Sequence, residues 1–241
     1  SDNSAEDAAA EADSVPEDQL LSSREQFSVA AKAALLIDLN TNRVVYEQDA
    51  DERVYPPSLT KLMTCLIALE NGNLSDVVTV SESALADLDE DSSVAGLVVG
   101  EQMTLENLLY CMMVVSGNDA CNVIAEHVAG SVTDFVRMMN QRAYELGCTN
   151  THFNNPHGLH DESHYTTARD LAIITQAALK SENFRQIVDT YEYKLPDDNM
   201  RQNIPKLKTT NMLIYQSMSN SLYYPRAHGI KTGYTSQAGR C

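Results

Sequence analysis

The 241-residue sequence is poor in positive charge. Lysine and arginine together number 17 against 34 aspartates and glutamates, and the formal net charge is -17. Proteins that bind nucleic acid neutralise phosphates with clustered lysine and arginine, and this chain has no such cluster. The composition therefore argues against a polyanion partner, and we expect no binding to nucleic acid.

The sequence also lacks the cysteine spacings and the long apolar run of two other protein classes. Its 5 cysteines are spread along the chain without a CxxC motif, so we expect neither a zinc ribbon nor a thioredoxin-like site. Cys65 and Cys111 fall inside apolar helical patterns and are interpreted as small buried side chains. No apolar run approaches the 18 or so residues that a membrane span requires.

The chain does contain an ordered series of predicted elements. Residues 1–25 are acidic and nearly free of bulky apolar side chains, which predicts a disordered lead-in to a folded domain over residues 26–241. Apolar alternation around an Asn-Thr-Asn turn at 40–42 predicts a β-hairpin. Helical periodicity then predicts helices at 58–71, 105–113, 120–130, 134–146 and 168–180. The β-prone segment 228–235 predicts a strand that another part of the chain approaches closely, so we expect a mixed α and β fold with an antiparallel sheet.

The start of the first predicted helix carries an S-x-x-K motif. Ser58 and Lys61 are three residues apart, so their side chains are neighbours on one helix face, away from the Leu and Met stripe. A serine hydroxyl becomes a strong nucleophile only when a base removes its proton, and a lysine with a lowered pKa can be that base. Taken alone, the motif is a weak signal, and a helix-capping serine beside a solvated lysine is the more frequent explanation of an isolated S-x-x-K.

Two further motifs follow in the chain. Ser116-Gly117-Asn118 interrupts two apolar helical patterns, where polar side chains can project into a cleft, and Lys231-Thr232-Gly233 lies in the β-prone segment near the end. A second S-x-N at 181–183 ends a predicted helix and is interpreted as a terminal polar patch.

Together the three motifs resemble those of serine D-alanyl-D-alanine carboxypeptidases, the low-molecular-mass penicillin-binding proteins. The segments "VYPPSLTKLMT", "VVSGNDACNVIAEH" and "GIKTGYTSQAG" carry the resemblance, which covers most of residues 29–241. It implies a β-lactamase/transpeptidase-like α/β fold, with an antiparallel sheet flanked by helices and a helical subdomain. In that family further strands and a helix follow the Lys-Thr-Gly segment, so we expect them, and any membrane anchor, to lie outside this chain.

The resemblance implies a role in acyl transfer for five positions. Ser58 would attack the carbonyl of the penultimate D-alanine. Lys61, kept neutral partly by the charge of Lys231, would take its proton, and Ser116 would relay a proton to the departing amine. Backbone N–H groups of Ser58 and Tyr234 would form the oxyanion hole.

Substrate binding is implied for the remaining motif residues. Asn118 would hydrogen-bond the substrate amide, and Lys231 and Thr232 would hold the terminal carboxylate beside Gly233 and Tyr234. The implied partners are peptidoglycan pentapeptide stems and β-lactams as covalent inhibitors, with no cofactor. The implied location is extracytoplasmic, on the outer side of the bacterial cytoplasmic membrane.

Other readings stay open at this point. A DD-endopeptidase or transpeptidase has the same three motifs. A Ser-Lys β-lactamase would also have an E-x-x-L-N loop and an aspartate in the middle of the second motif, and this sequence has neither. A noncatalytic binding protein or an incomplete fragment is the alternative of a different class.

A histidine-rich segment lies between the second and third motifs. His157, His160 and His164 stand near Asp161 and Glu162, residue types that can bind zinc, but no HExxH motif is present. Because "NNPHGLHDESH" resembles a loop of the same carboxypeptidase family, we interpret it as a polar loop beside the cleft and predict no metal.

Overall fold

The computed structural model describes residues 29–86, 88 and 92–241, so the lead-in predicted over residues 1–25 lies outside the described part. The predicted hairpin is present: β1 (Ala34–Asp38) pairs antiparallel with β2 (Arg43–Gln48). The carboxylate of Asp38 accepts hydrogen bonds from the backbone N–H groups of Asn40 and Thr41, at 2.8 and 3.2 Å. These bonds turn the chain between the two strands.

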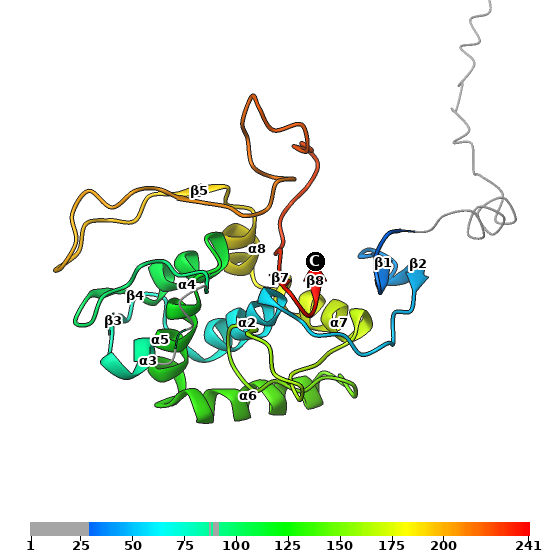
Figure 1. Cartoon of the computed structure of the whole chain (residues 1–241), viewed down its shortest axis with the longest axis horizontal. Helices are drawn as coiled ribbons and strands as arrows, with labels where there is room; N and C mark the ends of the chain where they lie inside the picture. Colours follow the sequence, from blue (N-terminus) through cyan, green and yellow to red (C-terminus); the bar gives the residue numbers. More distant parts are fainter. Residues whose placement is uncertain (1–28, 87, 89–91) are drawn as a thin grey trace, which may run out of the picture.

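Helix α2 (Lys61–Asn71) lies at the centre of the molecule (Figure 1). Its first eight residues, Lys61 to Ala68, are all buried, so the helix is enclosed on every side and not only along its apolar stripe. The amphipathic pattern predicted a polar face, and that face is instead buried against the rest of the protein. The helices that pack on α2 are α4 (Leu105–Val114), α5 (Asn118–Ala129), α6 (Val132–Glu145), α7 (Ala168–Ala178) and α8 (Glu182–Val188).

Helices α4 to α7 occur where periodicity predicts them, whereas the sequence patterns predicted neither α8 nor the short helix α3 (Glu82–Ala86). Helix α4 ends just before the Ser-Gly-Asn motif and α5 begins within it, as the sequence indicates. At the start of α7 the hydroxyl of Thr167 accepts the N–H of Asp170 at 3.0 Å, which is the predicted cap.

The strands form four separate antiparallel pairs in the described part of the chain. Besides the first hairpin, the pairs are β3 (Val77–Thr79) with β4 (Gln102–Thr104), β5 (Glu192–Tyr193) with β6 (Leu207–Lys208), and β7 (Tyr234–Thr235) with β8 (Gly239–Arg240). The prediction of a strand over 228–235 is therefore wrong for residues 228–232. Backbone pairing begins only at Gly233, which exchanges two hydrogen bonds with Cys241, because no described strand lies beside residues 230–232.

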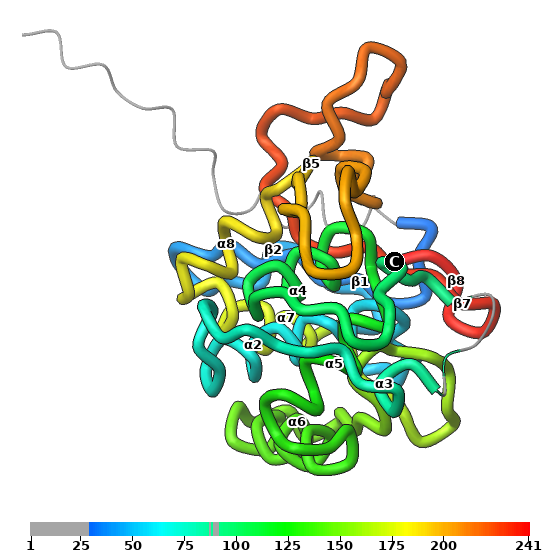
Figure 2. The backbone as a smooth tube through the Cα atoms, turned by 90° about the vertical axis from the view of Figure 1, so that its left-hand side faces the viewer, coloured from blue at the N-terminus to red at the C-terminus, as the bar shows by residue number. Residues whose placement is uncertain are grey.

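The segment between β6 and β7 extends away from the helices, whereas α6 lies at the opposite end of the body (Figures 1 and 2). Within the ranges described, none of the helices combines the length and apolar character needed to cross a membrane. Cys65 and Cys111 are fully buried in the core, as predicted, and both are free thiols.

Candidate active site

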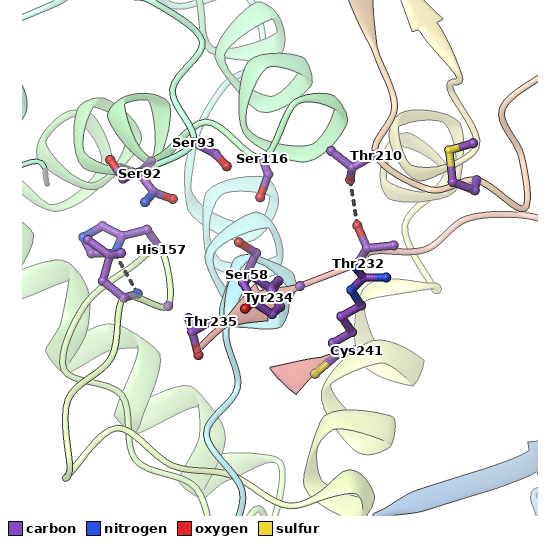
Figure 3. A pocket seen from close by; sticks show the side chains of 16 residues that line it. Ser58, Ser92, Ser93, Ser116, His157, Thr210, Thr232, Tyr234, Thr235 and Cys241 are labelled. Carbon is purple, nitrogen blue, oxygen red and sulfur yellow. Dashed lines mark hydrogen bonds between the residues drawn. The ribbon is translucent and has the colours of Figure 1, made fainter. Parts of the chain in front are cut away.

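Ser58 opens the short 3-10 helix η1 (Ser58–Thr60), which continues directly into α2. A cavity of about 490 Å³ lies over it, with walls from segments far apart in the chain (Figure 3). Six predicted site residues line this cavity: Ser58, Ser116, Asn118, Thr232, Gly233 and Tyr234. The turn from η1 into α2 thus places the serine at the floor of a cleft that the other two motifs surround.

Lys61 lies beneath Ser58 and is 0% exposed. Its Nζ atom is 2.7 Å from Asn118 Oδ1, 2.8 Å from the carbonyl oxygen of His157 and 3.2 Å from Ser58 Oγ. The first two atoms are carbonyl oxygens, which can only accept hydrogen bonds. A neutral amine satisfies both with its two N–H groups and directs its lone pair at the Ser58 hydroxyl, which is the arrangement that a general base requires.

Burial favours that neutral form. It lowers the pKa of Lys61 below its ordinary value, because the buried ammonium loses its hydration, and the fields of Cys121 and Asp119 oppose the shift only in part. The pKa of Lys231 is lowered to about 7, again by burial first and then by the neighbouring Lys61 charge. Because the charge on Lys61 disfavours protonation of Lys231, the pair favours a state with fewer than two protonated amines.

The second motif adopts an unusual backbone conformation. Ser116 has a φ of +63°, a left-handed conformation that costs a non-glycine residue energy and is common at functional sites. Next to it, a β-carbon on Gly117 would lie 2.8 Å from Asp119 Oδ1 and 3.1 Å from the carbonyl oxygen of Cys111. This tight turn allows Ser116 to face the cavity while Asn118 reaches down to Lys61.

Asp119, which the sequence reasoning missed, anchors one wall of the cleft. Its carboxylate accepts the backbone N–H groups of residues 95–97, at 2.9 to 3.0 Å. The N–H of the preceding Asn118 donates to the carbonyl oxygen of Ser93 at 2.8 Å. Because Ser92 and Ser93 line the cavity, these bonds fix the 92–97 segment against the second motif. The only sequence signal for Asp119 was its position directly after the Ser-Gly-Asn motif.

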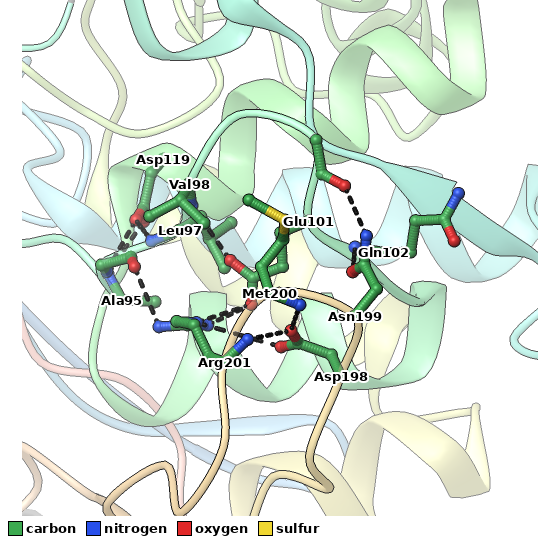
Figure 4. Close-up of polar contacts among 12 residues, drawn as sticks. Ala95, Leu97, Val98, Glu101, Gln102, Asp119, Asp198, Asn199, Met200 and Arg201 are labelled. Atoms are coloured by element: carbon green, nitrogen blue, oxygen red, sulfur yellow. Dashed lines mark hydrogen bonds and ion pairs between the residues drawn. The ribbon is translucent and has the colours of Figure 1, made fainter.

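A buried ion pair holds the far end of the same segment (Figure 4). Glu101 is 0% exposed and accepts from Arg201 Nε at 2.8 Å, while Arg201 Nη1 donates to the carbonyl oxygen of Gly96 at 2.9 Å. Burial, together with a hydrogen bond to Asp198, raises the pKa of Glu101. The Arg201 guanidinium therefore ties the wall of the cleft to the 198–201 turn.

The third motif passes over the start of η1. A β-carbon on Gly233 would lie 2.9 Å from Pro57 Cγ and 3.1 Å from Ser58 N, so a glycine here permits the close approach that the sequence predicted. Thr232 Oγ1 is 2.7 Å from Thr210 Oγ1, and both threonines line the cavity. Thr210 had no sequence signal, since it is brought to the site by the fold.

Lys231 differs from Thr232 and Gly233 of the same motif, because it is not among the described residues that line the cavity. Its Nζ donates to the carbonyl oxygen of Thr232 at 2.8 Å. After burial, the positive charge of Lys61 is the next cause of the lowered pKa of Lys231. Tyr234 lies in β7 at the rim, with its side chain exposed.

The histidine segment supports the site from below. Besides accepting from Lys61, His157 is buried with a pKa lowered to about 3 by loss of hydration, and its Nδ1 accepts the N–H of Leu159 at 3.2 Å. His164 is also buried, whereas His160 is exposed. Among the residues described, no three histidine, cysteine or acidic side chains are placed to hold a metal ion.

Solved structures define the class to which this fold and cleft belong. The DD-transpeptidase of Streptomyces K15 matches with a TM-score of 0.78 and 32% identity, covering 88% of this chain and 83% of that one. Penicillin binding protein 5 from Haemophilus influenzae matches with a TM-score of 0.76 and 34% identity, covering 88% of this chain and 60% of that one. The chain therefore has the fold of the DD-transpeptidases and penicillin-binding proteins, which confirms the predicted fold class.

Sequence comparison narrows the class to one family. The family model of peptidase S11, described as D-alanyl-D-alanine carboxypeptidase, matches residues 20–241, and the chain belongs to this family. Similar relatives are the D-alanyl-D-alanine carboxypeptidases DacF of Bacillus subtilis, 41% identical over 88% of this chain, and DacA of Escherichia coli, 36% identical over 88%. The chain spans about half the length of these curated relatives, 52% and 51% respectively.

Proposed function

We propose that this chain carries the catalytic centre of a serine D-alanyl-D-alanine carboxypeptidase that is acylated by penicillin. Ser58 Oγ attacks the carbonyl carbon of the penultimate D-alanine while the neutral amine of Lys61 takes the hydroxyl proton. The new Oγ–C bond gives a tetrahedral intermediate with an oxyanion. The nucleophile and base already lie 3.2 Å apart, so the substrate has only to enter the cavity.

Collapse of the intermediate breaks the C–N bond to the terminal D-alanine. The departing amine needs a proton, which Ser116 passes on from the Lys61 ammonium, and D-alanine leaves with the acyl group held on Ser58. Water then adds to the acyl-enzyme carbonyl while Lys61 accepts its proton. The Oγ–C bond breaks as Lys61 returns this proton to Oγ, which restores the Ser58 hydroxyl and the neutral amine and releases the carboxylic acid. Protons and electron pairs balance over the cycle, with water as the only co-substrate.

The other motif residues bind the substrate in this proposal. Asn118 hydrogen-bonds the substrate amide, and Lys231 with Thr232 holds the terminal carboxylate. Gly233 and Tyr234 border the peptide, and the N–H groups of Ser58 and Tyr234 stabilise the oxyanion, where one such donor changes the rate by about a hundredfold or more. A β-lactam acylates Ser58 by the same first step, but its amine stays tethered to the acyl group.

The observation that carries the proposal is the environment of Lys61 Nζ. In its neutral form the amine donates both N–H groups to the carbonyl oxygens of Asn118 and His157, which leaves its lone pair for the Ser58 hydroxyl, 3.2 Å away. A lysine with a purely structural role ordinarily keeps its ammonium group in water, whereas Lys61 is fully buried. The proposed substrates are peptidoglycan pentapeptide stems, which places the reaction outside the cytoplasmic membrane.

The test follows release of D-alanine from a peptide that ends in D-Ala-D-Ala. The parent is expected to release D-alanine and to bind labelled penicillin covalently, and Ser58→Ala is expected to do neither. Ser93→Ala is the matched control, because Ser93 lines the same cavity and its backbone carbonyl contact to Asn118 survives the substitution. Equal D-alanine release by the parent and Ser58→Ala defeats the proposal.

Product analysis separates the enzymes that share this site. Fast penicillin hydrolysis without D-alanine release identifies a β-lactamase, and cleavage of a cross-linked dimer in preference to the pentapeptide identifies an endopeptidase. Slow penicillin turnover with D-alanine release is the carboxypeptidase result. Transfer of the acyl group to an added amino acid, in excess of hydrolysis, identifies a transpeptidase.

A further inference from the structure

The histidine segment (residues 154–164) is joined to η1 and the start of α2 by buried polar contacts. Thr64 Oγ1 donates to the carbonyl oxygen of Pro156 at 2.6 Å, and Lys61 Nζ donates to that of His157 at 2.8 Å. A third contact joins Thr60 Oγ1 to His164 Nε2 at 2.8 Å, and both of these residues are buried. The first two contacts use backbone carbonyls, so only the third depends on a side chain of the segment.

The direction of hydrogen bonding through His164 follows from its neighbours. The backbone N–H of Asn154 donates to His164 Nδ1 at 3.1 Å, so Nδ1 is the unprotonated nitrogen and Nε2 carries the hydrogen. Nε2–H then donates to Thr60 Oγ1, whose own hydrogen goes to the carbonyl oxygen of Pro56 at 2.7 Å. Each donor in this series of hydrogen bonds has one acceptor, and the series leads from the histidine segment into η1.

Thr60 stands between the two residues on which acylation depends. It closes η1 with its N–H on the carbonyl oxygen of Pro57, at 3.0 Å, and Lys61 follows directly. A rotation of this single turn changes the 3.2 Å separation of Ser58 Oγ and Lys61 Nζ. A side chain that fixes Thr60 therefore fixes the orientation of the nucleophile relative to its base.

We infer that His164 is a positioning residue for acylation, acting through Thr60 on the alignment of Ser58 with Lys61. The inference rests on the proposed function. In the described part of the chain the cavity lining does not include His164, so the imidazole acts without touching substrate. It also packs edge-on against Phe153, with ring centroids 5.6 Å apart, and a purely structural role would lie in that contact and in the Asn154 bond.

Two conservative variants separate these roles. In His164→Gln the amide nitrogen can take the place of Nε2 and keep the donor to Thr60, whereas in His164→Asn the amide oxygen can take the place of Nδ1 and keep only the Asn154 bond. The positioning role predicts near-parental acylation by labelled penicillin for His164→Gln. It predicts a fall of about tenfold or more for His164→Asn, since misplacements near 1 Å cost up to about a hundredfold.

Substitutions at the other partner provide the matched pair. Thr60→Val keeps the β-branched shape but removes the hydroxyl, and with it the contacts to His164 and to the Pro56 carbonyl oxygen, whereas Thr60→Ser keeps the hydroxyl. We expect Thr60→Val to lower the acylation rate constant as much as His164→Asn, with unchanged noncovalent affinity for penicillin, and the double variant to fall no further. Thr60→Ser should acylate at about the parental rate, and this pair decides the question if a His164 variant fails to fold.

The outcomes distinguish the inference from the function it rests on. Labelling of the parent with equal rate constants in His164→Gln and His164→Asn, or in Thr60→Val and Thr60→Ser, overturns the positioning role alone. A loss that appears only as weaker penicillin affinity also overturns it. Failure of the parent to label, with no D-alanine release, overturns the proposed function instead.

Discussion

Substitution of Gly158 tests whether the packing of the histidine segment against Pro56 and Pro57 positions Ser58. The φ of Gly158 is +95°, a conformation that strains any other residue. A β-carbon there would lie 1.9 Å from the carbonyl oxygen of Pro57, 2.4 Å from Pro57 C and 3.0 Å from the carbonyl oxygen of Pro56. All three are backbone atoms, so Gly158→Ala forces the segment away from the residues directly before Ser58.

The magnitude follows by comparison with Gly147. That glycine has a similar φ of +83° and no atom within 4 Å of a β-carbon, so Gly147→Ala measures backbone strain alone, about 1 to 2 kcal/mol. Gly158→Ala adds an overpacking cost of about 1 to 3 kcal/mol. It also moves the His157 carbonyl or Ser58 away from Lys61, so acylation should fall by about tenfold or more.

Urea unfolding and labelling with fluorescent penicillin measure the two effects. We expect a lower free energy of unfolding for Gly158→Ala than for Gly147→Ala, with slowed acylation only in Gly158→Ala. If the two variants have equal free energies of unfolding and both acylate at the parental rate, the contact between Gly158 and Pro57 does not position Ser58.

Three further predictions concern charge. Lys61→Met removes the base and should slow penicillin acylation by about a hundredfold or more in a folded protein, as checked by circular dichroism; near-parental acylation would exclude Lys61 as the base. Arg201→Met leaves the fully buried Glu101 without its cation and should lower the free energy of unfolding by about 3 kcal/mol, part of which Glu101→Gln should restore; no change in urea unfolding contradicts this. The pKa of His164 is lowered from 6.5 to about 4, mainly by burial, so the unfolded chain binds this proton first and the parent loses stability as pH falls from 6.5 to 4. The parent should lose about 3 kcal/mol more than His164→Gln over that range, and equal losses refute the assignment.

Much of the site could be predicted because its chemistry is local in sequence. The spacing of Ser58 and Lys61 sets them on one helical turn, and the break between two apolar helices indicated Ser116 and Asn118. The order of the three motifs then suggested the family. Local periodicity also predicted the first hairpin and helices α2 and α4 to α7 to within a few residues, but neither α3 nor α8.

What could not be predicted depends on contacts between distant segments. The hydrogen-bond partners of the buried Lys61 Nζ, Asn118 Oδ1 and the His157 carbonyl oxygen, are 57 and 96 residues away in sequence. No periodicity reports on such contacts, and the apolar stripe of α2 gave no sign that its polar face is buried. The predicted strand at 228–235 was only partly present, because strand formation depends on a neighbouring strand and not on β propensity alone.

The central claim is that Lys61 is neutral at the pH of catalysis and is therefore the base for Ser58. Titration of the lysine side chains by NMR, with ¹³C at Cε and Lys61→Met to assign the signal, tests this directly. We predict that Lys61 titrates clearly below the ordinary lysine pKa of 10.5, as burial requires. A Lys61 signal that titrates at or above 10.5 would contradict the account.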